Sequence, residues 1–166
     1  MSASESSIPV FTLGRSPHIG KTLQDKILPE FDLVHFSTSP ESAKEELNRL
    51  LSGEHVVLAS GIGSNKDRPP NEQRLPWLLA IGTAFSQEEY DDMKNSIDLT
   101  GGGNLSGDQI PVWVNRYPED STPKGSDGQA LTPFLPDGQF NPELVKAVVH
   151  TAKTRYTETA KTHGLM

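Results

Sequence analysis

Apolar and polar residues alternate along the chain in short blocks that predict strands and helices in turn. Five apolar runs that are rich in β-branched residues read as strands: 8–13, 31–37, 55–59, 77–81 and 110–115. Residues 21–28 have apolar positions at helical spacing, and Ser39-Pro40, Ser86 with Glu89, and Asn141-Pro142 are typical helix starts. The chain therefore reads as strands separated by helices.

This order predicts the fold class. Strands that are apolar along their whole length are typical of a parallel sheet that is covered on both faces. We expect an α/β protein with three layers, in which a doubly wound, mostly parallel five-stranded sheet has a Rossmann-like or flavodoxin-like arrangement. Residues 1–7 are expected to be a disordered tail, and 8–166 a single domain with long loops at 64–76 and 118–140.

Composition narrows the class of partner. The net charge of −7 and the absence of a basic cluster disfavour nucleic acid and anionic membranes. The chain has no cysteine, which excludes thiol catalysis and thiolate zinc sites, and its histidines are not at metal-ligand spacing, so no metal is expected. With no signal-like or membrane-spanning segment in view, the expected location is the cytoplasm.

The stretch Gly14-Arg15-Ser16-Pro17-His18-Ile19-Gly20-Lys21-Thr22 follows the first apolar run. It is not a P-loop, because five residues instead of four separate its glycines and Pro17 lacks an N–H. Gly14, Pro17 and Gly20 do have the spacing of a dinucleotide fingerprint, with proline at the middle position. Gly14, Ser16, Gly20, Ser37 and Thr38 are therefore the candidate cofactor-binding residues.

Residues 10–28 resemble the first β-α unit of the short-chain dehydrogenases, and they also resemble a group of small fungal Rossmann-like proteins without an established common activity. The resemblance implies a Rossmann-like fold. If a cofactor binds, the resemblance implies NADP, with Arg15, Ser37 and Thr38 near its 2′-phosphate; the alternative is that no cofactor binds. Tyr90 and Lys94 form a Y-x-x-x-K pair, which we interpret as coincidence because it follows the fourth predicted strand rather than the fifth.

Ligands of open α/β sheets bind beyond the carboxyl ends of the strands. Three residues there are candidate catalytic groups: Arg15 and Arg116 would stabilise an oxyanion, and His18 would move a proton. His35, inside a strand, reads as structural. The candidate substrate-binding residues are Ser60, Gly61, Ser64, Thr83, Asn115 and Tyr117.

The sequence leaves three functions open. The first is a protein that binds a small polar or anionic metabolite, with cofactor-independent acid/base chemistry of the isomerase, cyclase or lyase type. The second is an NADP-binding protein similar to the oxidoreductases. The third is a non-catalytic interaction module, in which Phe134, Phe140 and the last helix form a homodimer or partner surface.

Overall fold

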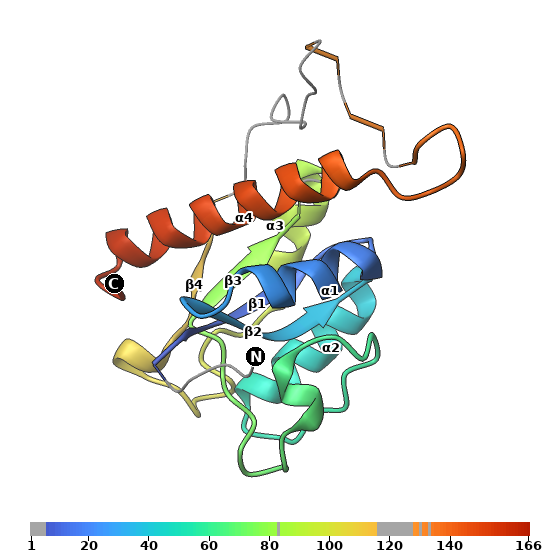
Figure 1. Ribbon diagram of the computed structural model, residues 1–166. Coiled ribbons are helices and arrows are strands. Elements are labelled where there is room, and N and C mark those ends of the chain that lie inside the picture. Colours follow the sequence, from blue (N-terminus) through green and yellow to red (C-terminus); the bar gives the residue numbers. More distant parts are fainter. Residues whose placement is uncertain (1–5, 83, 116–127, 130, 133) are drawn as a thin grey trace.

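A four-stranded parallel sheet organises the chain in a computed structural model that describes residues 6–82, 84–115, 128–129, 131–132 and 134–166 (Figure 1). The strands are β1 (Ile8–Leu13), β2 (Phe31–Ser37), β3 (Leu78–Ile81) and β4 (Val112–Trp113), in the order β2-β1-β3-β4. The helices are α1 (Pro17–Lys26), α2 (Pro40–Leu51), α3 (Gln87–Ser96) and α4 (Pro142–Thr162), with short 3₁₀ turns at Ser64–Asp67 and Gly107–Gln109.

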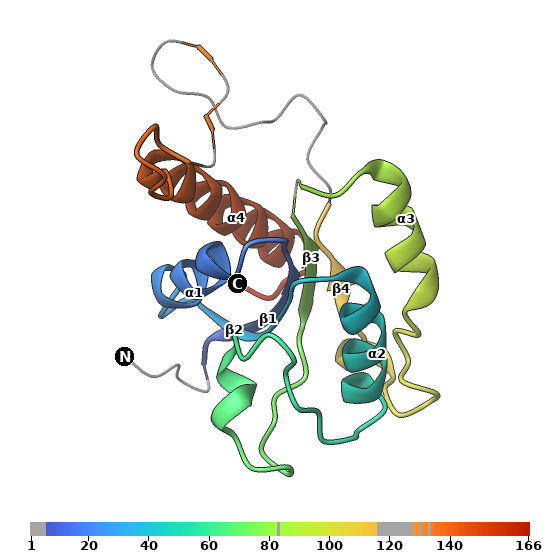
Figure 2. The same ribbon diagram turned by 90° about the vertical axis from the view of Figure 1, so that its right-hand side faces the viewer.

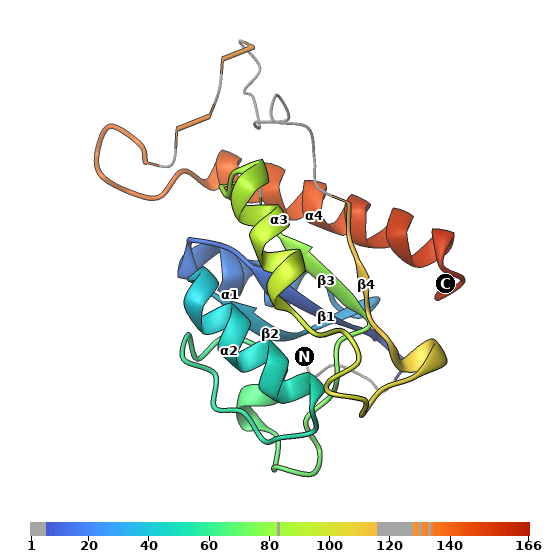
Figure 3. The same ribbon diagram turned by 180° about the vertical axis from the view of Figure 1, so that it is seen from behind.

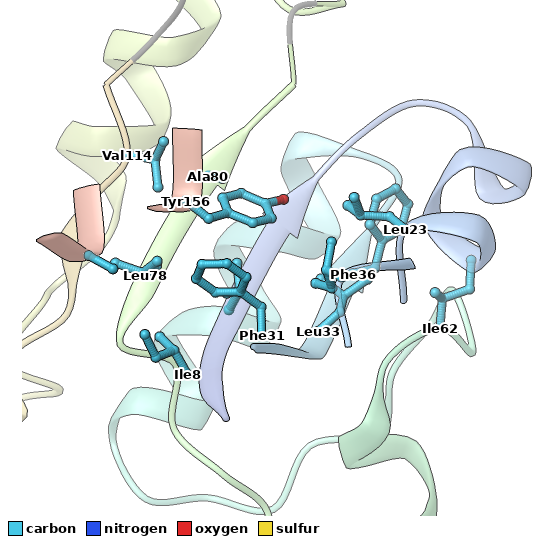
Figure 4. Packing of buried hydrophobic residues seen from close by; sticks show 13 residues of the cluster. Ile8, Leu23, Phe31, Leu33, Phe36, Ile62, Leu78, Ala80, Val114 and Tyr156 are labelled. Carbon is cyan, nitrogen blue, oxygen red and sulfur yellow. The ribbon is translucent and has the colours of Figure 1, made fainter. Parts of the chain in front are cut away.

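The helices cover both faces of the sheet and make three layers. Figure 2 shows α1 and α4 on one side of the strands and α2 and α3 on the other. In Figure 3, which views the molecule from behind, α2 and α3 lie in front of the sheet. Each face has its own apolar core. Ile8, Leu23, Phe31, Phe36 and Tyr156 belong to the core beneath α1 and α4 (Figure 4). Phe11, Leu47, Leu79 and Met93 belong to the core beneath α2 and α3.

The expected α/β class is confirmed, but the prediction of five strands is wrong for the described residues. Residues 55–59 form no strand, although they alternate between exposed and buried positions. The side-chain amide of Gln73 binds both the N–H and the carbonyl of Val56, so one glutamine occupies the place of a neighbouring strand. Val57 points outward and is 79 % exposed.

Local end signals place the helices well. Ser16, Ser39, Ser86 and Asn141 are all N-caps whose side chains accept a backbone N–H, and proline follows three of them. The first helix begins at Pro17, four residues before the predicted start, because Ser16 caps it. The fifth predicted strand is limited to Val112–Trp113, two of its six residues.

The segment after residue 59 runs along the open edge of β2. Phe36 N–H donates to the Ile62 carbonyl at 3.0 Å, and Gly63 lies so close to β2 that an added Cβ would be 2.5 Å from the Val34 carbonyl oxygen. A bulge at this level, between Leu33 and His35, shifts the register against β1. The long loop at 64–76 is therefore a cover for an edge strand, which limits pairing with other chains.

An aspartate anchors this cover at the amino end of β2. The side chain of Asp32 is 2 % exposed, and its carboxylate receives hydrogen bonds from Arg68 at 3.1 Å, Arg74 at 2.9 Å and the Ser64 hydroxyl at 2.5 Å. Arg74 also binds Ser7, which is buried. The expectation that Ser7 belongs to a disordered tail is wrong for that residue, and residues 1–5 lie outside the described part.

Candidate functional site

At the carboxyl edge of the sheet, the connections that follow the parallel strands β1 and β3 go to opposite faces. From β1 the chain enters α1 on one face, and from β3 it enters α3 on the opposite face. In open α/β sheets a crevice forms where successive loops leave in opposite directions, and ligands bind there. Gly82 N–H donates to the Leu13 carbonyl at 2.8 Å, which holds the two loops together.

Arg15 spans this point. From the β1–α1 loop, its Nε donates to the Ala84 carbonyl at 3.3 Å and its Nη2 to Glu89 at 2.9 Å, while its guanidinium lies 4.1 Å from the centroid of the Phe85 ring. The side chain is still 51 % exposed. The sequence correctly placed Arg15 at this edge, but it did not indicate that Glu89 is its partner, because 74 positions separate the two residues.

Glu89 serves two contacts at once. Its carboxylate accepts the Ser86 N–H at 3.1 Å as the second half of the capping box on α3, and it also pairs with Arg15. The Ser86 N–H and, secondly, the positive charge of Arg15 hold the pKa of Glu89 below its usual range. The ion pair is therefore built on a helix start that is itself well defined.

The two glycines of the fingerprint have a packing role. A Cβ on Gly14 would lie 2.9 Å from the Phe36 ring, and one on Gly20 would lie 2.7 Å from it. The Gly14 N–H donates to the Ser37 carbonyl at 3.0 Å, and Ser16 uses its hydroxyl to cap Ile19. Neither glycine therefore needs a bound nucleotide to explain its presence.

His18 is exposed on the first turn of α1. Its ring lies against that of Phe140, in the segment that precedes α4, with 4.8 Å between the ring centroids and a tilt of 39°. Phe140 in turn packs edge-on against Phe134, which is 59 % exposed. The segment 134–141 therefore reaches the same edge of the sheet as Arg15 and His18.

The end of β2 contributes a buried hydroxyl. Ser37 is 1 % exposed, and its Oγ has no hydrogen-bond partner among the described residues. Thr38 follows it and is half-buried. Ser60 lies at the same end of β2, where its hydroxyl donates to the Phe36 carbonyl and accepts the Ile62 N–H. Gly61, with a positive φ of 68°, makes the turn between Ser60 and Ile62.

Not every predicted residue joins this edge. Ser64 lies at the opposite, amino end of β2 on Asp32, because the chain between Ser60 and Ser64 runs the length of the strand. Its prediction as a substrate-binding residue at this edge is wrong. Asn115 is exposed just after β4. Thr83, Arg116 and Tyr117 lie outside the described residues.

Two sequence interpretations can be compared with side-chain contacts. The hydroxyl of Tyr90 donates to the Val114 carbonyl at 3.1 Å, and Lys94 lies over the Tyr90 ring at 5.3 Å from its centroid. Tyr90 is buried and packs between α3 and the segment after β4. His35 is buried and binds Glu46 at 2.9 Å, a partner that the sequence analysis did not identify.

Within the described ranges, no group of three or more histidines, aspartates or glutamates is placed to hold a metal ion. None of the described helices is both long and apolar enough to cross a membrane.

Comparison with known proteins gives two similar sequences, both from fungi. The chain is 25 % identical over 160 residues to Kojic acid related protein 6 of Aspergillus oryzae, which covers 95 % of this chain and 81 % of that protein. It is 36 % identical over 70 residues to the 26S proteasome regulatory subunit 6A of Saccharomyces cerevisiae, which covers 42 % of this chain but only 16 % of that subunit. No family model matches the chain, and no solved structure matches it.

Proposed function

We propose that this protein binds a small anionic metabolite at the carboxyl ends of β1 and β3, with Arg15 as the positive contact. The strand order β2-β1-β3-β4 equals the first four positions of the flavodoxin-like order, a fold whose ligand lies beside β1 and β3. The observation that carries the proposal is the position of Arg15, which reaches from the loop after β1 to the segment after β3 and remains half exposed.

Arg15 has hydrogen-bonding capacity to spare. A guanidinium has five N–H donors, and the contacts to Ala84 and Glu89 use Nε and Nη2. The backbone N–H groups of Arg15, Ser16 and His18 have no acceptor among the described residues. Since they lie at the start of α1, the helix dipole adds to the attraction for an anion.

The contact with Glu89 does not prevent binding. An exposed ion pair is weak, because water screens the attraction between its charges. A doubly charged anion such as a phosphate monoester therefore competes readily with one carboxylate for Arg15. Glu89 keeps its place in the capping box when Arg15 turns toward the ligand.

His18 is the group that we propose moves a proton in cofactor-independent acid/base chemistry at this site. It is exposed on the first turn of α1, three residues after Arg15, and imidazole is the side chain most used for proton transfer near neutral pH. Contact with Phe140 orients its ring. Arg116 keeps its proposed role as a second oxyanion contact.

NADP binding is the second candidate function. Close packing of Gly20 on Phe36 lets α1 approach the sheet, which is the role of the last glycine in the dinucleotide fingerprint. Pro17 at the middle position and the burial of Ser37 favour a smaller ligand. The third candidate is a surface for a second copy of the chain, built on Phe134 and Phe140. The exposure of Phe134 supports it.

The test is binding measured by calorimetry and by thermal shift with inorganic phosphate, NADPH and kojic acid, the last because of the name of the Aspergillus relative. Arg15→Gln is the variant. Arg49→Gln is its matched control, because Arg49 is also an exposed arginine in ion pairs, near the end of α2.

We expect phosphate affinity to fall at least about fivefold in Arg15→Gln, which corresponds to about 1 kcal/mol of binding free energy. The affinity should be unchanged in Arg49→Gln. Equal loss in both variants would mean unspecific charge attraction, and it would overturn the proposal. Binding of NADPH at least about a hundredfold tighter than that of phosphate would favour the second candidate.

A further inference from the structure

Strand β2 carries two buried polar side chains that each leave one atom without a partner. His35 is 0 % and Ser37 1 % exposed, and neither His35 Nδ1 nor Ser37 Oγ has a hydrogen-bond partner in the described part of the chain. Buried polar atoms are nearly always paired, so two such atoms close together call for a specific explanation.

The two side chains lie on the same face of β2. His35 pairs with Phe11 and Ser37 with Leu13, and both of these apolar residues belong to the core beneath α2 and α3. Ser37 is the next side chain on this face toward the carboxyl end, about 6.6 Å along the strand. Its carbonyl binds the Gly14 N–H, next to Arg15, so Ser37 lies between His35 and the proposed anion site.

Glu46 of α2 sets the direction of the hydrogen bonds. Its Oε1 accepts the Ala59 N–H at 3.2 Å and contacts His35 Nε2 at 2.9 Å. A carboxylate has no proton to donate, so Nε2 must carry the hydrogen. A neutral imidazole with its hydrogen on Nε2 has an unprotonated Nδ1, which is an acceptor.

Ser37 has the complementary group. Its hydroxyl can donate to Nδ1, either after rotation about the serine Cα–Cβ bond or through one bridging water. Once its hydrogen is used in this way, the Ser37 oxygen offers only lone pairs. The chain of bonds from Glu46 therefore ends at a hydrogen-bond acceptor at the edge of the sheet.

We propose that the ligand of this site is an anion that also carries a hydroxyl or amino group, and that this group donates to Ser37 Oγ while the negative charge binds Arg15. The inference rests on the proposed function and specifies its ligand class. Ser37 is 1 % exposed in this structure, so the proposal requires the side chains above it to move when the donor group binds. An analogue without the donor would leave the buried acceptor unpaired, which is a strong means of discrimination.

Glycerol 3-phosphate and propyl phosphate are matched probes, since they differ only in two hydroxyl groups. Their dissociation constants are to be measured by NMR titration for the unaltered protein, for Ser37→Ala and for Ser96→Ala, a control serine near the end of α3 that binds the Asp92 carbonyl. We expect glycerol 3-phosphate to bind at least about tenfold tighter. Ser37→Ala should abolish this preference while it leaves the affinity for propyl phosphate unchanged, and Ser96→Ala should preserve both.

The outcomes separate the two proposals. Binding of both probes with equal affinity through Arg15, or a preference that survives in Ser37→Ala, overturns the inference on the donor group and leaves the anion site standing. Failure of Arg15→Gln to weaken either probe overturns the anion site and, with it, this inference.

A second measurement needs no ligand. Imidazole ¹⁵N spectra should show His35 protonated at Nε2 only, and Ser37→Ala should shift the Nδ1 resonance, whereas Ser96→Ala should not. A proton found on Nδ1 would reverse the direction of the chain and overturn the inference, whatever the titrations show.

Discussion

Gly20 of α1 and Phe36 of β2 are in direct contact, and an added Cβ at Gly20 would lie 2.7 Å from the Phe36 ring. The ring is 1 % exposed and packed within the core beneath α1 and α4, so it has no room to retreat. The contact explains why a residue of low helix propensity lies inside α1, and it sets the distance between that helix and the sheet.

Gly20→Ala is therefore expected to destabilise the protein. Overpacking of a filled core costs about 1–3 kcal/mol, while the gain in helix propensity returns about 1 kcal/mol, so we expect a net loss of about 1 kcal/mol. Urea unfolding measures it. The same substitution in a Phe36→Leu background should be neutral or stabilising, and a stabilising effect in the unaltered background would show that the ring is mobile.

Loss of the Asp32 carboxylate should weaken the attachment of the loop 64–76 to the edge strand β2. Asp32→Asn leaves Arg68 and Arg74 without their buried countercharge, for which we expect a loss of about 3 kcal/mol. In the same variant, exchange of the Phe36 backbone N–H, which donates to the Ile62 carbonyl, should become faster. Asp25→Asn, at an exposed position of α1, is the control and should change stability by less than about 0.5 kcal/mol.

A buried pair of hydroxyls ties α4 to the sheet. Tyr156 and Thr12 share a hydrogen bond of 2.7 Å between the helix and β1. Tyr156→Phe leaves the Thr12 hydroxyl buried without this partner, and we expect a loss of about 1–2 kcal/mol in denaturant unfolding. Thr12→Val removes the hydroxyl that Tyr156→Phe leaves unpaired. The double variant should therefore lose less stability than the sum of the losses in the two single variants, and strict additivity would contradict a direct hydrogen bond.

Asp98 should titrate below its ordinary pKa of 3.8. The hydroxyl of Thr100 is the main cause, followed by the backbone N–H groups of Thr100 and Gly102, all of which donate to the carboxylate. Carboxyl ¹³C spectra measured against pH test this. Thr100→Val should raise the pKa of Asp98 toward 3.8, and an unchanged titration in that variant would rule out the hydroxyl as the main cause.

The sign of the effect on stability follows from the same shift. Because the pKa is lower in the folded chain, ionised Asp98 favours folding. This contribution is complete above the unfolded value of about 3.8 and is lost as the pH falls through the folded pKa. Asp98→Asn should therefore reduce the slope of stability against pH below about pH 4.

Whatever depends on near neighbours in the chain was determined by the sequence itself. The caps at Ser39, Ser86 and Asn141 were readable because a cap binds an N–H two or three residues away, whereas the cap at Ser16 was missed and the first helix was predicted to begin at residue 21. The same holds for the alternation of strands and helices and for Arg15 at the end of β1, since both follow from local hydrophobic pattern and position.

Whatever depends on a distant partner was decided only by the tertiary structure. Residues 55–59 have a strand-like pattern but form no strand, because pairing requires an adjacent edge and the Gln73 side chain binds Val56 instead. Glu46 beside His35, Glu89 beside Arg15 and the two arginines on Asp32 are equally invisible in the sequence. These contacts join different elements, so their geometry exists only once the layers have packed.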